Sequence, residues 1–141
     1  HRRSRSATVP GCDSELPLPQ YRESEKKYPL VLISPATSHT INSMFADTDP
    51  PRVAISMHPQ DAAQRKLTDA QRVIVRNDVA SIEIDLVIDE TMRPGVCFIP
   101  KGLWMRATQT GLTSNAFAPD DLNDLASGAC FNDARVEVTV A

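Results

Sequence analysis

The chain has 141 residues, 41% of them hydrophobic and 23% charged, and a formal net charge of −3. This length and composition predict one globular domain with a core of its own. No run of eighteen apolar residues occurs, so we expect no membrane-spanning helix and no membrane partner. The basic residues 1–6 are not followed by the apolar stretch that a signal peptide needs.

Charge and cysteine usage narrow the expected partners and location. Residues 28–141 carry nine Lys and Arg against fourteen Asp and Glu. This part is acidic, whereas a nucleic-acid surface would need a basic stripe, so no nucleic acid is expected as a partner. Cys12, Cys97 and Cys130 form neither an even disulfide framework nor a CxxC metal spacing. We therefore expect reduced thiols and a cytoplasmic protein.

The first part of the chain differs from the rest. Residues 1–27 lack apolar periodicity and contain Pro10, Pro17 and Pro19, which predicts a linker or extended tail. From residue 28 onward the pattern is mainly that of strands, and 28–141 is taken as the folded domain. Apolar runs and alternating residues predict six short strands, at 30–33, around 53–55, and at 71–77, 81–88, 96–99 and 136–140.

One short helix and one tight turn complete the predicted elements. The helix covers residues 58–67, where Pro59 suits the first turn and His58 a capping or surface position. Asn77-Asp78 is expected to turn between two strands, although no glycine supplies the usual positive φ. Six short strands with so little helix indicate a compact all-β barrel.

No familiar catalytic motif is present, since the sequence has no GxSxG, Walker loop, GxGxxG or HExxH. A polar segment, Ser34–Ser43, instead gathers hydroxyls, an imidazole and an amide after the first predicted strand. From the residues alone, a solvated loop is favoured over a binding loop for this segment. His39 has no second ligand at suitable spacing, so it is not expected to hold a metal.

Ordered blocks of sequence carry a resemblance to a known family. They are Leu30–Ser43, Val53–Ala62 and Arg93–Trp104, followed by Ser114–Phe117 and Phe131–Val138. In this order they resemble the C-terminal dinucleotide-binding domain of molybdopterin oxidoreductases, the dimethyl-sulfoxide-reductase and formate-dehydrogenase superfamily. The resemblance implies an all-β, six-stranded double-psi barrel with one or two short helices.

The chain departs from the family pattern just after the predicted helix. The family continues with Gly-Ile and then Asp-Gly-Asp, whereas this chain has 66–72 as Lys-Leu-Thr-Asp-Ala-Gln-Arg, without glycine. The turn geometry is left open there, because Ala70 and Gln71 resist a positive φ. Asp61 would either accept a hydrogen bond from a guanine or, as we favour, stabilise the start of the helix.

The resemblance also implies which residues contact a pterin dinucleotide. The asparagine after the fifth strand, Asn115, would hydrogen-bond the pterin ring. Trp104 would stack on the pterin or else fill the core, and Lys101 would pair with a phosphate or remain exposed. Phe131 is expected to anchor the barrel. The cofactor-binding residues implied in this way are Thr37, His39, Asn42, Ser43, Lys101, Gly102, Trp104, Asn115 and Asn132.

By resemblance, the function is to hold part of a bis-molybdopterin guanine dinucleotide with molybdenum or tungsten. The remaining domains of a parent oxidoreductase would share the cofactor and be the partners of this domain. The domain would not be catalytic alone, since the residue that ligates the metal would lie outside this chain. Two alternatives stay open: a non-catalytic double-psi barrel adaptor that binds protein partners, and a separate small subunit of a multi-chain molybdenum enzyme.

Overall fold

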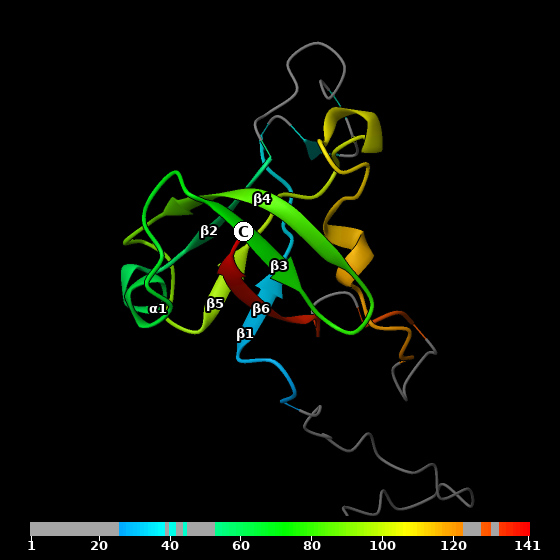
Figure 1. Cartoon of the computed structure of the whole chain (residues 1–141). Helices are drawn as coiled ribbons and strands as arrows, with labels where there is room; N and C mark the ends of the chain where they lie inside the picture. Colours follow the sequence, from blue (N-terminus) through cyan, green and yellow to red (C-terminus); the bar gives the residue numbers. More distant parts are fainter. Residues whose placement is uncertain (1–25, 39, 42–43, 45–52, 123–127, 131–132) are drawn as a thin grey trace, which may run out of the picture.

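Six strands close into a barrel in the computed structural model of this chain (Figure 1). The structure describes residues 26–141 apart from 39, 42–43, 45–52, 123–127 and 131–132. The strands are β1 (Leu30–Ile33), β2 (Ala54–Met57), β3 (Arg72–Arg76), β4 (Ser81–Ile88), β5 (Val96–Phe98) and β6 (Arg135–Val140). Each lies within a residue or two of a predicted strand.

The sheet is mixed, and its strands follow the order β1-β5-β2-β4-β3-β6 around the barrel. β1 with β5 and β2 with β4 are parallel, while the other neighbours are antiparallel. The helical elements whose bounds lie within the described residues include α1 (Pro59–Gln64) and the 3₁₀ turns η2 (Met105–Ala107) and η3 (Ser114–Phe117). The prediction of an all-β, six-stranded barrel is therefore confirmed, and the mixed closed sheet agrees with a double-psi barrel.

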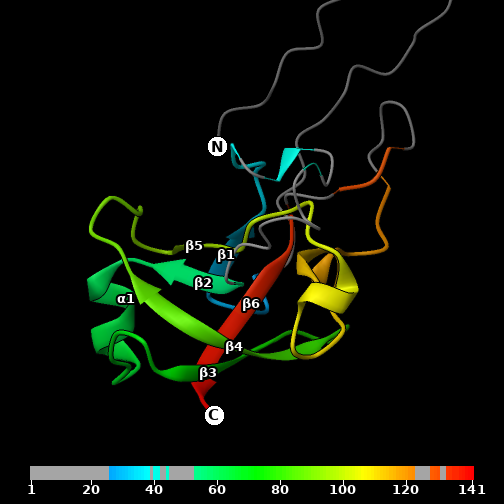
Figure 2. The same ribbon diagram turned by 90° about the horizontal axis from the view of Figure 1, so that it is seen from above.

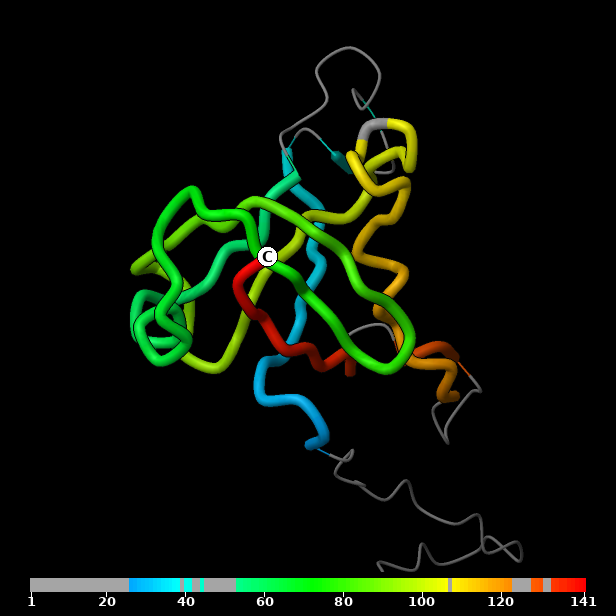
Figure 3. Tube along the Cα trace, viewed as in Figure 1, coloured from blue at the N-terminus to red at the C-terminus, as the bar shows by residue number. Residues whose placement is uncertain are grey.

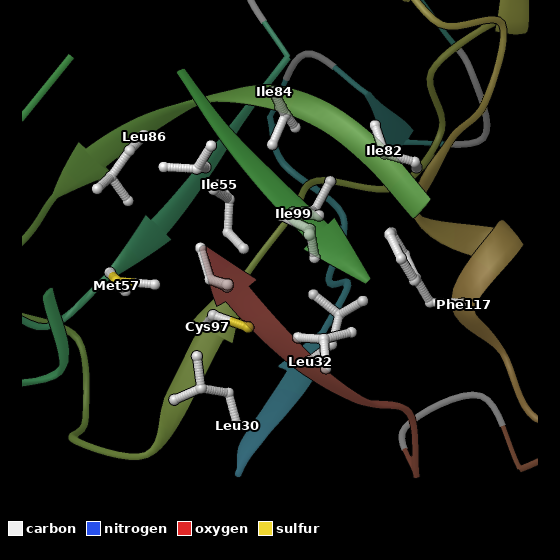
Figure 4. Close-up of a cluster of buried hydrophobic side chains, with 14 of the residues drawn as sticks. Leu30, Leu32, Ile55, Met57, Ile82, Ile84, Leu86, Cys97, Ile99 and Phe117 are labelled. Atoms are coloured by element: carbon white, nitrogen blue, oxygen red, sulfur yellow. The ribbon is translucent and has the colours of Figure 1, made fainter. Parts of the chain in front are cut away.

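Side chains that alternate along the strands fill the barrel interior (Figure 4). On β4, Ile82, Ile84 and Leu86 are buried while Glu83 lies outside, as the alternation of the sequence predicts. The interior is closed by Phe117, which comes from η3 rather than from a strand and is fully buried. The other buried core members include Leu30, Leu32, Ile55, Met57, Val73, Val75, Cys97, Ile99, Val136 and Val138.

The turn between β3 and β4 is closed by a side chain instead of by glycine. Asn77 Oδ1 accepts hydrogen bonds from the backbone N–H groups of Val79 and Ala80, at 2.9 and 3.0 Å. Its own N–H donates to the Ala80 carbonyl at 2.9 Å. An Asn side chain that bonds nearby backbone in this way stabilises a turn without any positive φ. The predicted hairpin is confirmed, and the missing glycine is explained.

The helix α1 has the start that the sequence predicts. His58 is the N-cap, and its Nδ1 accepts a hydrogen bond from the Gln60 N–H at 3.0 Å. Asp61 is buried, and its Oδ2 accepts from the Gly95 N–H at 2.7 Å. Asp61 therefore ties the helix to the turn before β5. Asp61 is also the acidic residue in the first turn of α1, where it stabilises the start of the helix as the sequence favours.

The segment after α1 keeps its tight turns despite the absence of glycine. Lys66 has φ 56° and Ala70 has φ 59°. Lys66 comes just before Leu67, and Ala70 comes just after Asp69. Lys66 and Ala70 therefore stand where the family pattern described above has its glycines. At the first turn the Leu67 N–H donates to the Ala62 carbonyl at 2.9 Å, a helix C-terminal motif that needs a left-handed residue before it. Both left-handed residues carry a Cβ, so the backbone is strained at both positions.

Candidate cofactor-binding site

Two of the predicted binding segments leave the barrel at the same end. Because β1 and β5 are parallel neighbours, the chain emerges from both strands in the same direction (Figures 1 and 2). Beyond the strands, the Ile99 N–H donates to the Ile33 carbonyl at 3.2 Å, and the Lys101 N–H donates to the Pro35 carbonyl at 3.3 Å. The start of the loop after β1 is therefore held beside the start of the segment after β5.

A pair of threonines shapes the loop after β1. Thr40 is fully buried, and its hydroxyl lies 2.8 Å from that of Thr37. The Thr40 hydroxyl also accepts a hydrogen bond from the Thr37 N–H at 3.3 Å, and the Thr40 N–H donates to the Thr37 carbonyl at 3.3 Å. These bonds hold Thr37 and Thr40 against each other, with Thr37 half-buried at the start of the loop.

The segment after β5 presents an aromatic ring and two cations. Gly102 adopts φ 82°, a left-handed conformation that glycine accepts without strain. Leu103 is buried, whereas the next residue, Trp104, is 43% exposed. The Arg106 guanidinium carbon lies 4.9 Å from the centroid of the Trp104 ring, a cation–π contact. The alternative that Trp104 fills the core is wrong, because Leu103 takes the inward position.

Asn115 stands on a separate element, η3, which follows η2 down one side of the barrel (Figure 3). Two contacts fix η3: its own Phe117 is inserted into the core, and the Asn77 Nδ2 donates to the Phe117 carbonyl at 3.0 Å. Asn115 itself is exposed. The hydroxyl of Ser114 is buried without a hydrogen-bond partner among the described residues.

The structure thus places five of the nine predicted residues. Thr37, Lys101, Gly102 and Trp104 belong to the two adjoining segments, and Asn115 is carried by η3. The remaining four, His39, Asn42, Ser43 and Asn132, lie outside the described residues, as does Phe131. The segment that leads into β6 also reaches this end of the barrel, since the Leu32 N–H donates to the Ala134 carbonyl at 2.9 Å.

Three further residues shape the site and were not among the predicted ones. Thr40 bonds Thr37 in the segment after β1, Asn77 anchors η3, and Arg106 lies over Trp104. Thr40 could have been suspected from its Thr-x-x-Thr spacing with Thr37, which suits a local turn. The contact between Asn77 and Phe117 joins residues forty apart, and no local pattern indicates it.

The donors gathered here suit a ligand that is partly neutral and partly anionic. Hydroxyl and amide groups match the alternating donors and acceptors of a heterocycle, and Lys101 and Arg106 match phosphate. Among the described residues, no group of three or more His, Cys, Asp or Glu could hold a metal ion. In the same residues no helix is both long and apolar enough to cross a membrane.

Comparison with known proteins decides the family. The model of the molydopterin dinucleotide binding domain matches residues 30–135. The chain belongs to the molydopterin dinucleotide binding domain family. The match begins at the first residue of β1 and ends at the first residue of β6. The family match thus covers five strands of the barrel, the first residue of the sixth, and every predicted site residue.

Relatives of this molydopterin dinucleotide binding domain are much longer than it is. The probable oxidoreductase YoaE of Bacillus subtilis (strain 168) is 25% identical over 130 residues, which cover 86% of this chain and 19% of that protein. Acetylene hydratase from Pelobacter acetylenicus shares the fold, with a TM-score of 0.65 and 18% identity over 82% of this chain. The chain spans 19% of that structure as well.

Proposed function

We propose that this domain holds one half of a bis-molybdopterin guanine dinucleotide, jointly with other domains of a larger oxidoreductase. The observation that carries the proposal is the family match over residues 30–135, together with the polar segments that leave one end of the barrel. The family match favours this function over a protein-binding adaptor. The bound metal would be molybdenum or tungsten.

The described residues fit such a cofactor. Thr37 and Asn115 offer neutral hydrogen-bonding groups for the pterin edge, and Lys101 offers a cation for the phosphates. At Gly102 the absence of a side chain lets a ligand approach the backbone. When bound, the cofactor supplies the metal and its redox chemistry, whereas this chain binds and orients it.

The domain would not act alone. It spans 19% of the lengths of its relatives, so the rest of a parent polypeptide would supply the other binding surfaces and the metal ligand. One relative carries the name of an oxidoreductase and the structural neighbour that of a hydratase. We infer an oxidoreductase parent from the relative with the detectable sequence match.

Substitution of Asn115 tests the proposal. We expect Asn115→Ala, in the native polypeptide that contains this chain, to weaken cofactor binding about fivefold, the effect of one lost hydrogen bond near 1 kcal/mol, and so to lower the pterin recovered per protein after denaturation. Gln109→Ala removes another exposed amide between η2 and η3 and is the matched control. Equal pterin content in the wild type and both variants would rule out the role of Asn115. A wild type without pterin would rule out the function.

A further inference from the structure

The segment just before β1 is fixed to the distant turn between β3 and β4. The Lys27 Nζ donates a hydrogen bond to Asp78 Oδ2 at 2.5 Å, and the Tyr28 hydroxyl donates to Asp78 Oδ1 at 2.8 Å. Two adjacent residues thus bind the two oxygens of one carboxylate, which lies 50 residues beyond Tyr28. The Lys27 Nζ also lies 5.9 Å from the centroid of the Tyr28 ring. We refer to the contacts of Lys27 and Tyr28 with Asp78 as the strap.

The register of β6 explains why these residues meet. On one side of β6, Val136 lies opposite Leu30 at the start of β1, and on the other side Glu137 lies opposite Arg76 at the end of β3. Because Val136 and Glu137 are consecutive, the segment that enters β1 and the turn that leaves β3 come together at one place on the barrel. Arg76 adds positive charge near Tyr28 at the same place. The strap therefore follows from closure of the barrel and not from a local pattern of sequence.

The strap can be lost without disturbing the barrel. The Lys27 and Asp78 side chains are 61% and 56% exposed, so their ion pair lies in water. Exposed pairs of this kind are weak and are screened by salt. The three residues of the strap are not members of the buried core. The β3–β4 turn is closed by Asn77, whose bonds to Val79 and Ala80 do not involve the strap.

We propose that Asp78 is the anchor of a releasable strap, which sets where the polypeptide that precedes the barrel is attached to it. With the strap closed, the point of attachment is Lys27, beside the β3–β4 turn. With the strap open, the point of attachment moves to Leu30, the first residue of β1. The three residues released add about 10 Å to the reach of the tether. This inference goes beyond the proposed function and does not depend on it.

Endoproteinase Lys-C, which cuts after lysine, tests whether Lys27 is held. Brief digestion of the native 141-residue chain at low salt gives fragments that begin at Lys27 or at Tyr28, and mass spectrometry measures their ratio. A Lys27 side chain bound to Asp78 cannot enter the pocket of the protease, so cleavage after Lys27 reports the open strap. Asp78→Asn should raise the share of the fragment that begins at Tyr28 about threefold. Added salt should raise this share in wild type but not in Asp78→Asn.

Glu90→Gln is the matched control, because it removes another exposed carboxylate two residues beyond β4, at the opposite end of that strand from the turn. It should leave the fragment ratio as in wild type.

Ionisation of Tyr28 gives a second measurement. The hydrogen bond to Asp78 raises the pKa of Tyr28 above its ordinary value. In a Tyr21→Phe chain, where Tyr28 is the remaining tyrosine, Asp78→Asn should shift the ultraviolet titration of tyrosine to lower pH, and Glu90→Gln should not. If Asp78→Asn leaves either the fragment ratio or this titration as in wild type, or if Glu90→Gln changes the ratio equally, the strap is refuted. The proposed cofactor function is then unaffected, because pterin content tests it separately.

Discussion

The two left-handed residues after α1 should make this domain more stable when they are replaced by glycine. A left-handed backbone costs a residue with a Cβ about 1–2 kcal/mol, and glycine removes this cost. Glycine also gives the unfolded chain more freedom, which offsets about 0.4–1 kcal/mol of the gain. At Ala70, with φ 59°, the free energy of unfolding should therefore rise by roughly 0.5–1 kcal/mol.

The contacts of Ala70 support a simple interpretation of this change. Its N–H donates to the Leu86 carbonyl at 3.0 Å, and glycine keeps that bond. Lys66 has φ 56° and is also exposed, so Lys66→Gly should give a similar gain. The two together should raise the melting temperature by about 3–8 °C for a domain of this size.

Ala63→Gly is the matched control, because it makes the same chemical change at an exposed residue inside α1. In a helix the substitution should lower the free energy of unfolding by about 1 kcal/mol. Urea unfolding followed by circular dichroism measures the free energy of unfolding of wild type and both variants. If Ala70→Gly destabilises the domain as much as Ala63→Gly does, the left-handed backbone at Ala70 is refuted.

Three other predictions follow from single contacts. Asn77→Asp keeps the acceptor that closes the β3–β4 turn but loses the donor to the Phe117 carbonyl. It should lower the free energy of unfolding by about 1 kcal/mol and speed amide hydrogen exchange in η3. Unchanged exchange would contradict the anchoring of η3 by Asn77. A hydrogen bond from Lys27, and to a smaller extent one from Tyr28, holds the pKa of the Asp78 carboxyl below its ordinary value. The stability that the ionised carboxylate contributes should therefore be complete above about pH 4 and disappear as the pH falls through the lowered pKa. The melting temperatures of wild type and Asp78→Asn, measured from pH 2.5 to 7, should converge in acid. A difference in melting temperature that grows in acid would show that the pKa of Asp78 is raised and not lowered. Burial raises the pKa of the Cys97 thiol to about 12. In a variant without the other two cysteines, a thiol reagent at pH 8 should therefore modify Cys97 only at the rate of unfolding. Rapid modification of the folded chain would be inconsistent with this burial.

The sequence predicts the strands well because their signal is local. The alternation of Ile82, Ile84 and Leu86 with polar residues places one face of β4 in the core, and the structure agrees. The helix start at His58 and Pro59 is local in the same way. The order of strands around the barrel is not local, and the resemblance to a family was needed to predict it.

The candidate site was less accessible from the sequence. The exposure of Trp104 depends on the neighbouring Leu103, which occupies the inward position, and a single tryptophan in a polar segment does not show which residue turns inward. The left-handed turn at Lys66 is maintained by backbone hydrogen bonds to the end of α1, and the one at Ala70 by a bond to the distant Leu86 carbonyl; these bonds outweigh the local preference of each residue. The cytoplasmic location stays a prediction from cysteine usage.

The central claim is that this barrel clamps a molybdopterin guanine dinucleotide. The most direct measurement purifies the native polypeptide that contains the chain, denatures it, and quantifies oxidised pterin, GMP and metal in the released material. The account predicts pterin and GMP in equal amounts, together with molybdenum or tungsten. A protein free of pterin and GMP, from cells that load a control molybdenum enzyme, would contradict it.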